Sequence, residues 1–221
     1  MKRFTLTIIA CLLLTSVFSQ GSIVLNDKPF IITPKRDTAL DNWLEQIPAY
    51  VQLNAQEKEV IYWVNYVRKE PQRFSTAILT PFLEQFPEVK SHYTNSLIRD
   101  LSSLSSLTLL TPSAQLQDLA ESHSKDLGSN SRSISHNSSS GKSFKERLNE
   151  FGYFECASEN VYEGKKDGLQ AVLFLLIDAG VQNLGHRKNI LDSNMKYTSA
   201  SFSLITGRLH HHFMVQNFSC K

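Results

Sequence analysis

The sequence predicts an α+β domain built in layers, because helical segments fill its middle and β-rich segments close it. Residues 169–177 are apolar on every side, which is typical of a helix buried between two layers. Residues 196–206 and 209–218 then alternate in polarity. This alternation predicts two antiparallel strands joined by a turn at Gly207 and Arg208.

Composition indicates a globular protein and argues against two classes of partner. The chain has 221 residues, of which 41% are hydrophobic and 20% charged, enough for one sizeable core. Without Lys2 and Arg3, the 23 Lys and Arg residues fall to 21, which equals the 21 Asp and Glu residues. A neutral chain without a dense basic block is not typical of a nucleic-acid binder or of a polybasic membrane-surface protein.

The N-terminus, residues 1–20, has the pattern of a secretory signal peptide. Two basic residues precede an apolar run over residues 4–18, and small and polar residues follow. The alternative is an N-terminal membrane anchor, which needs roughly 20 apolar residues. No other stretch reaches that length, so we expect a mature protein without a membrane span that is secreted, extracellular or periplasmic.

Export changes the interpretation of the cysteines. Cys156 and Cys220 remain after the predicted cleavage, and an oxidising compartment permits a bridge between them. The sequence does not give their separation in space, so the bridged and the free forms both stay open. The absence of a C-x-x-C pattern argues against a zinc ribbon and a thioredoxin-like site.

The predicted elements begin with an arm and a long helix. Residues 21–53 are punctuated by proline and are expected to form a lead-in arm, with one helical turn group around residues 40–46. The domain itself is expected to cover residues 54–221. Asn54 and Glu57 have capping-box spacing, and the apolar periodicity that follows predicts a helix that Pro71 ends.

Three further segments follow in order. Residues 91–111 are rich in serine and are expected to form a loop with one short helical patch. Thr111 is predicted to cap a helix that has Pro112 at its first position and ends at Gly128. Residues 129–141 have the composition of an exposed loop.

Another capping box marks the next helix. Ser143 and Glu146 have the required spacing, and apolar residues follow on one face. Gly152 is the predicted stop of this helix.

Several common catalytic patterns are missing from the sequence. There is no G-x-S-x-G, no H-E-x-x-H and no G-x-G-x-x-G, so a nucleophile elbow, a standard zinc protease and a dinucleotide enzyme are not indicated. What remains is His136, Glu159 and His186 in polar settings rich in turns. Two imidazoles and a carboxylate can bind zinc or copper, or they can form a proton-transfer pair, and spacing does not distinguish these uses.

Five short patterns occur in one order along the chain. They are S-H-N at 135–137, F-x-E-R-L at 144–148, S-E-N-V-Y at 158–162, G-H-R-x-N-I-L at 185–191 and V-Q-N-F at 215–218. In this order and behind a signal peptide, the sequence resembles the CAP superfamily of cysteine-rich secretory proteins, antigen 5 and pathogenesis-related proteins. The cysteine-poor form with G-H-R-x-N is similar to bacterial members.

The resemblance implies a three-layer α-β-α sandwich with a central antiparallel sheet and a shallow cleft. It implies that a tetrad of His136, Glu159, Asp178 and His186 lines this cleft. Asp178 is included because it is the one acid that the helix before the second histidine offers. His136 and His186 are then the candidate ligands of a divalent metal such as zinc.

The resemblance also implies a set of functions. The first is a secreted binder of a lipid-like ligand, a divalent metal or an extracellular partner protein. The alternatives are an extracellular hydrolase, metal-dependent or acid/base and peptidase-like, and a purely structural extracellular domain. Ser135 is the candidate nucleophile for a hydrolase, although adjacent residues on an extended chain point to opposite sides.

Other residues of the patterns have plainer interpretations. His123 lies on the apolar stripe of its helix and is expected to be a core histidine rather than a ligand. Arg187 and Asn189 are expected to be structural. The run His210-His211-His212 is expected to give adventitious metal affinity only.

Overall fold

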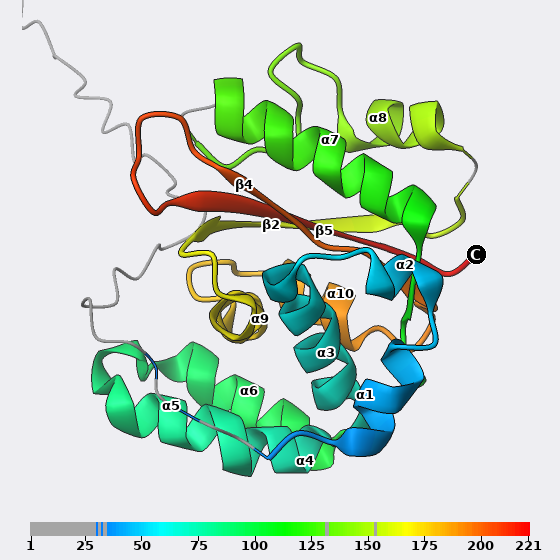
Figure 1. The fold of residues 1–221 in the computed structure, drawn as a ribbon. Helices are drawn as coiled ribbons and strands as arrows, with labels where there is room; N and C mark the ends of the chain where they lie inside the picture. The colour runs from blue at the N-terminus through cyan, green and yellow to red at the C-terminus, as the bar shows by residue number, and fades with distance from the viewer. Residues whose placement is uncertain (1–29, 31, 33–34, 131–132, 153) are drawn as a thin grey trace, which may run out of the picture.

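The computed structural model describes residues 30, 32, 35–130, 133–152 and 154–221. The predicted signal peptide at 1–20 therefore lies outside the described residues, as does most of the segment that precedes residue 35. In this part of the chain, helices cover both faces of one sheet, with α7 and α8 on one face and the other helices on the opposite face (Figure 1). This arrangement confirms the predicted α+β, three-layer α-β-α sandwich.

The sheet is built around β5. It contains the strands β1 (Thr111–Pro112), β2 (Ser158–Gly164), β3 (Tyr197–Thr198), β4 (Ser201–Leu204) and β5 (His212–Ser219). β2 pairs with one side of β5, and β3 and β4 pair with its other side, all antiparallel. β1 pairs with β3 in parallel, so the sheet is mixed rather than wholly antiparallel.

Two predicted helices form the middle of the lower layer, which is the helical layer on the face of the sheet opposite α7 and α8. α3 (Ala55–Lys69) begins at the predicted capping box, in which Asn54 accepts from the backbone of Glu57 and Glu57 accepts from the backbone of Asn54. α9 (Gly168–Ile177) packs against α3 and is buried on nearly all sides, as its all-round apolar sequence predicts.

Shorter helices complete the lower layer. They are α1 (Thr38–Leu44), α2 (Pro48–Val51), α4 (Pro71–Phe74), a π-helical turn (Ser75–Leu79), α5 (Thr80–Gln85), a 3-10 turn (Pro87–Val89) and α10 (Gly185–Leu191). Leu40, Leu44 and Tyr50 belong to the same apolar core as α3. The described part of the lead-in arm therefore packs into the domain, and its first helix begins two residues before the expected turn group.

Residues 91–111 are expected to form a loop with one short helical patch, but the helical part is longer than expected. Residues 92–103 form α6 (His92–Ser103), a helix of 12 residues. Ser91 and Thr94 make a capping box, and Leu97 and Leu101 are buried one turn apart. Ser102 and Ser103 of α6 are exposed and Ser96 is half-buried, so the serine-rich composition made the short apolar stripe difficult to recognise in the sequence.

The prediction that Thr111 caps a helix is wrong. Thr111 and Pro112 form β1, because the backbone N–H groups of Thr111 and Ser113 donate to the carbonyls of Lys196 and Thr198. The helix α7 (Ala114–Asn130) begins after Ser113 and runs past Gly128. A Cβ atom on Gly128 would lie 2.5 Å from the carbonyl oxygen of Leu204, so this glycine permits close helix–strand packing rather than ending the helix.

The C-terminal strand pair differs in its bounds from the prediction. The first predicted strand, 196–206, is divided into β3 and β4, and the connection to β5 covers residues 205–211. Gly207 and His210 both adopt positive φ angles, of 80° and 63°, which makes this turn longer than a two-residue hairpin. α8 (Phe144–Phe151) has the predicted capping box and ends at Gly152, which has a φ of 132°.

Cys156 and Cys220 form a disulfide, with their Cα atoms 5.8 Å apart. The bond joins the residue two places before β2 to the residue directly after β5. It therefore fastens the paired strands at the end of the sheet where Glu159 lies.

Candidate functional site

The first histidine–acid pair joins the loop after α7 to the start of β2. Nδ1 of His136 lies 3.0 Å from Oε1 of Glu159. The His136 side chain is 51% exposed, whereas that of Glu159 is 1% exposed. A buried carboxylate thus orients an imidazole that solvent can reach, and it fixes the proton on Nδ1 because a carboxylate can only accept.

The charge of Glu159 is compensated by an arginine. Nη2 of Arg147, on α8, lies 2.8 and 2.9 Å from the two carboxylate oxygens of Glu159 and 3.0 Å from the backbone carbonyl of His136. The amide of Asn217, on β5, donates to Oε2 at 3.3 Å when its nitrogen faces the carboxylate. These bonds offset the cost of burying the charge of Glu159, and they attach the His136 loop to α8.

His123 lies on α7 beneath this pair. Its Nε2 is 3.0 Å from the carbonyl oxygen of Ser135 and 3.9 Å from Oε1 of Glu159. Burial lowers the pKa of His123, and its Nδ1 is buried without a partner among the described residues. It is a buried histidine of the upper layer, as the apolar stripe predicts, and its ring braces the loop that carries His136.

The second pair, Asp178 and His186, connects the end of α9 to the start of α10. Asp178 has a left-handed backbone with a φ of 56°, and its Oδ1 lies 2.7 Å from Nδ1 of His186. Its Oδ2 accepts from the backbone N–H groups of His186 at 2.9 Å and Arg187 at 3.2 Å. Asp178 therefore caps the first turn of α10 as well as orienting the imidazole.

Arg187 is structural, in agreement with its expected role. Its guanidinium donates to the carbonyls of Leu176 and Ile177 at the end of α9, and it pairs with Asp100 on α6 at 2.8 Å. These contacts hold α10 in place, so the position of His186 is set by three helices.

The two pairs approach β2 from different layers. Glu159 turns toward α7 and α8, and the next residue, Asn160, turns toward α10, as expected for neighbours on a strand. Asn160 donates to the carbonyl of His186 at 3.3 Å, and Asn189 donates to the side chain of Asn160 at 2.8 Å and to the carbonyl of Glu159 at 3.4 Å. The structure links the pairs through these two asparagines.

The predicted tetrad is thus arranged as two pairs, His136 with Glu159 and Asp178 with His186. Among the residues that the structure describes, no group of three or more His, Cys, Asp or Glu side chains is placed to hold a metal ion. Ser135, the candidate nucleophile, has its hydroxyl in a turn, where it donates to the carbonyl of Asn137 at 3.0 Å and accepts from its N–H at 2.9 Å.

The sequence interpretation assigned no role to Arg147. The signal was present, because Arg147 stands with Phe144, Leu148 and Phe151 on the apolar face of its helix. An arginine at such a position must meet a buried acceptor. Asn217 was also assigned no role, although it stands in the V-Q-N-F pattern.

Within the described ranges, no helix is long and apolar enough to cross a membrane.

No curated protein sequence gives a significant match to this chain. One solved structure with a likeness is an extracellular protein containing a SCP domain from Bacillus anthracis, with 26% identity and a TM-score of 0.42 over 61% of this chain and 40% of that one. The chain thus spans two fifths of the length of that protein.

A second solved structure with a likeness is an outer surface protein from Borrelia burgdorferi. It is 16% identical, with a TM-score of 0.43, over 62% of this chain and 93% of that one. The family model described as "CAP: Cysteine-rich secretory protein family" matches residues 62–218, which include both histidine–acid pairs. This chain belongs to the CAP family.

Proposed function

We propose that this CAP-family protein is a secreted binding domain whose ligand is a divalent metal ion, such as zinc, taken up at His136 and His186. One observation carries the proposal: each imidazole is oriented through Nδ1 by a buried carboxylate. This arrangement makes Nε2 the ring nitrogen that is not bonded to the carboxylate, and it recurs in proteins at histidines that ligate metals.

The donor chemistry suits a loosely held ion rather than a closed structural site. Imidazole nitrogen is a good ligand for zinc, but a structural zinc site takes four protein ligands and a catalytic one takes three. The described residues offer no group of three donors, so an ion at these histidines would keep positions for donor atoms of a further ligand. Glu159 and Asp178 would act as orienting groups behind the histidines.

Binding is favoured over hydrolysis by the bonds that the other polar groups make. The hydroxyl of Ser135 is engaged by the backbone of Asn137, and a histidine is not its partner. Glu159 is held by Arg147 and His136, and Asp178 by the first turn of α10. Both carboxylates are thereby committed to orientation rather than to activating water.

Two features support secretion. The first twenty residues have the pattern of a signal peptide. The bond between Cys156 and Cys220 is of the kind that forms and persists in oxidising compartments.

The proposal is tested by isothermal titration of the full chain with zinc chloride. Because we expect His210, His211 and His212 to bind metal adventitiously, the titration is done on a variant in which all three are replaced by asparagine. We expect one zinc ion per chain, and His136→Ala lowers its affinity at least tenfold, since an imidazole ligand is lost. His92→Ala, an exposed histidine on α6, is the matched control and leaves the affinity unchanged.

A panel of peptide and ester substrates, with and without zinc, separates the proposal from its rival. Turnover that disappears in His136→Ala would favour the hydrolase. Absence of zinc binding in the asparagine variant, or equal affinity before and after His136→Ala, would contradict the metal site.

A further inference from the structure

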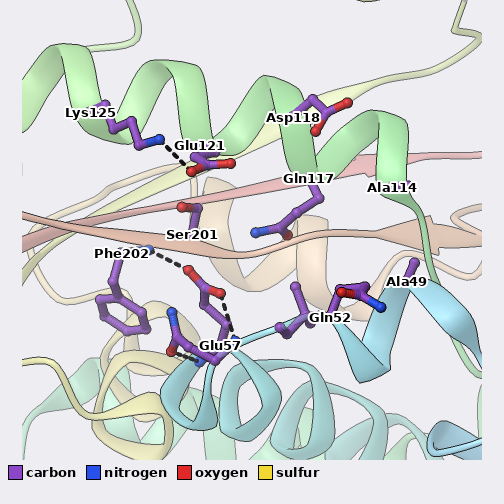
Figure 2. Close-up of a pocket in the computed structure, with 12 residues that line it drawn as sticks. Ala49, Gln52, Glu57, Ala114, Gln117, Asp118, Glu121, Lys125, Ser201 and Phe202 are labelled. Carbon is purple, nitrogen blue, oxygen red and sulfur yellow. Dashed lines mark hydrogen bonds and ion pairs between the residues drawn. The ribbon is translucent and has the colours of Figure 1, made fainter.

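A pocket opens on the side of β5 away from β2. It has a volume of about 490 Å³ and lies between α7 on one side and the α2–α3 junction on the other, with β4 behind it (Figure 2). Because β2 and β4 pair with opposite sides of β5, this pocket is separate from the histidine–acid pairs. Its volume is in the range of ligand sites in proteins.

β4 is an edge strand whose outer backbone groups are covered by side chains. Among the described strands, β4 pairs only with β5. At Ala200, the residue directly before β4, the side-chain amide of Gln117 donates to the carbonyl at 2.9 Å and accepts from the N–H at 3.2 Å. Two residues further along, the N–H of Phe202 donates to Oε1 of Glu57 at 3.2 Å.

The amide of Gln117 thus occupies the position of a residue on a neighbouring strand, because it bonds both the N–H and the carbonyl of Ala200. Gln117 and Glu57 both line the pocket, and Figure 2 shows their side chains reaching into it from α7 and α3. Such caps protect an edge strand from unwanted pairing, and they also mark where a chain segment could pair.

The walls of the pocket indicate which segment fits. Glu57, Asp118 and Glu121 line it against a single base, Lys125, which pairs with Glu121. Asp118 is exposed, and no hydrogen bond or ion pair joins its carboxylate to a described residue. Asp118 and Glu121 belong to α7, whereas the carboxylate of Glu57 on α3 accepts from the N–H groups of Asn54 and Phe202. The acid that is open to a basic ligand therefore lies on the α7 side.

The surface that faces α7 contains two apolar residues beside the polar Gln52, Asn54 and Glu57. Leu53 and Phe202 line the pocket, and Phe202 packs into the core below the sheet, whereas Ser201 turns toward Ser124 on α7. A strand added beside β4 has the same alternation, with every second side chain toward α7 and the others toward Leu53 and Phe202.

We propose that this pocket binds an extended peptide with alternating basic and apolar residues, which adds as a strand to the outer edge of β4. Its backbone replaces the amide of Gln117 at Ala200 and the carboxylate of Glu57 at the N–H of Phe202. Its basic side chains face Asp118 and Glu121, and its apolar side chains cover Leu53 and Phe202. The proposal is independent of the histidine site.

The test uses the full chain and three fluorescein-labelled nine-residue peptides, measured by fluorescence anisotropy. One alternates lysine and valine, one alternates glutamate and valine, and one alternates lysine and proline. The lysine–valine peptide binds saturably. The lysine–proline peptide keeps the charge but loses half of its N–H donors, so we expect roughly tenfold weaker binding from two lost hydrogen bonds. The glutamate–valine peptide is repelled and does not bind in the same concentration range.

Charge reversal in the pocket is compared with a matched reversal elsewhere. Asp118→Lys lowers the affinity for the lysine–valine peptide by about threefold to tenfold, because an attraction becomes a repulsion at a partly exposed site. Glu84→Lys changes an exposed acid on α5, outside the pocket, and leaves the affinity unchanged.

Hydrogen exchange distinguishes strand addition from charge attraction. In Gln117→Ala the N–H of Ala200 loses its cap and exchanges faster, and the bound lysine–valine peptide slows this exchange again. Equal affinity of the lysine–proline peptide, no effect of Asp118→Lys, or unchanged exchange at Ala200 in the peptide-bound variant would each overturn the proposal.

Discussion

His136 and His186 make the same bond to a carboxylate in different surroundings. The side chain of His136 is 51% exposed and stands on a loop, whereas that of His186 is 10% exposed and stands at the start of a helix. Glu159 is held by side chains from α8 and the His136 loop, and Asp178 mainly by the backbone of α10. The exposed pair therefore makes an oriented imidazole accessible to solvent, and the buried pair also stabilises the packing of the lower layer.

The largest expected difference between the pairs is in stability. Asp178→Ala leaves two backbone N–H groups and one imidazole N–H buried without an acceptor, so we expect a loss of about 3–5 kcal/mol in the free energy of unfolding. His136→Ala removes a ring that is half exposed and costs less than about 1 kcal/mol. Urea denaturation followed by circular dichroism measures both values.

Asp178→Asn is the control for the backbone, because asparagine tolerates the left-handed conformation and keeps one acceptor. It should cost less than the alanine variant. Similar losses for Asp178→Ala and His136→Ala would remove the distinction between a structural pair and a presenting pair.

The disulfide should support the exposed pair more than the buried one. Cys156 lies three residues before Glu159, and the bond closes a sequence separation of 64 residues. Replacing both cysteines by serine should cost about 2–4 kcal/mol, mainly by freeing the unfolded chain. We expect hydrogen exchange to accelerate at the start of β2 and to stay unchanged at α10, and the reverse pattern would contradict this assignment.

A smaller effect concerns pH. Burial lowers the pKa of His123 below the ordinary value of 6.5. The unfolded chain then takes up a proton that the folded chain resists, so His123 lowers stability as the pH falls below about 6.5 and has no effect above it. Glu159 and Asp126 oppose this shift, and Arg147 adds to it.

His123→Gln removes the titrating group beneath the exposed pair. We expect the variant to lose less stability than the wild-type chain between pH 7.5 and pH 5, measured by thermal denaturation at each pH. An identical loss in both proteins would show that His123 does not titrate in this range.

Local signals predicted those elements whose ends are fixed by neighbours in the chain. The capping boxes at Asn54 and Ser143 and the apolar stretch at 169–177 were sufficient for α3, α8 and α9. β1 was not predicted because the N–H groups of Thr111 and Ser113 donate to carbonyls more than eighty positions away in the sequence. A distant hydrogen bond of this kind overrode the helix signal of Pro112.

The sequence predicted which residues form the site but not how they pair in space. The five short patterns pointed to His136, Glu159 and His186, and the family's known arrangement added Asp178. Which histidine meets which acid depends on the αL turn at Asp178 and on the alternation along β2, which places Glu159 and Asn160 on opposite faces. The buried Arg147 completes the site because the buried charge of Glu159 requires a partner.

The most direct test of the account is the protonation of the two imidazoles, observed by long-range ¹H–¹⁵N NMR of the full chain labelled at histidine. The account predicts that His136 and His186 carry their proton on Nδ1 near pH 7.5, and that zinc chloride shifts the Nε2 resonances of both rings. Protons on Nε2, or Nε2 resonances that zinc leaves in place, would show that the carboxylates do not orient these rings toward a metal.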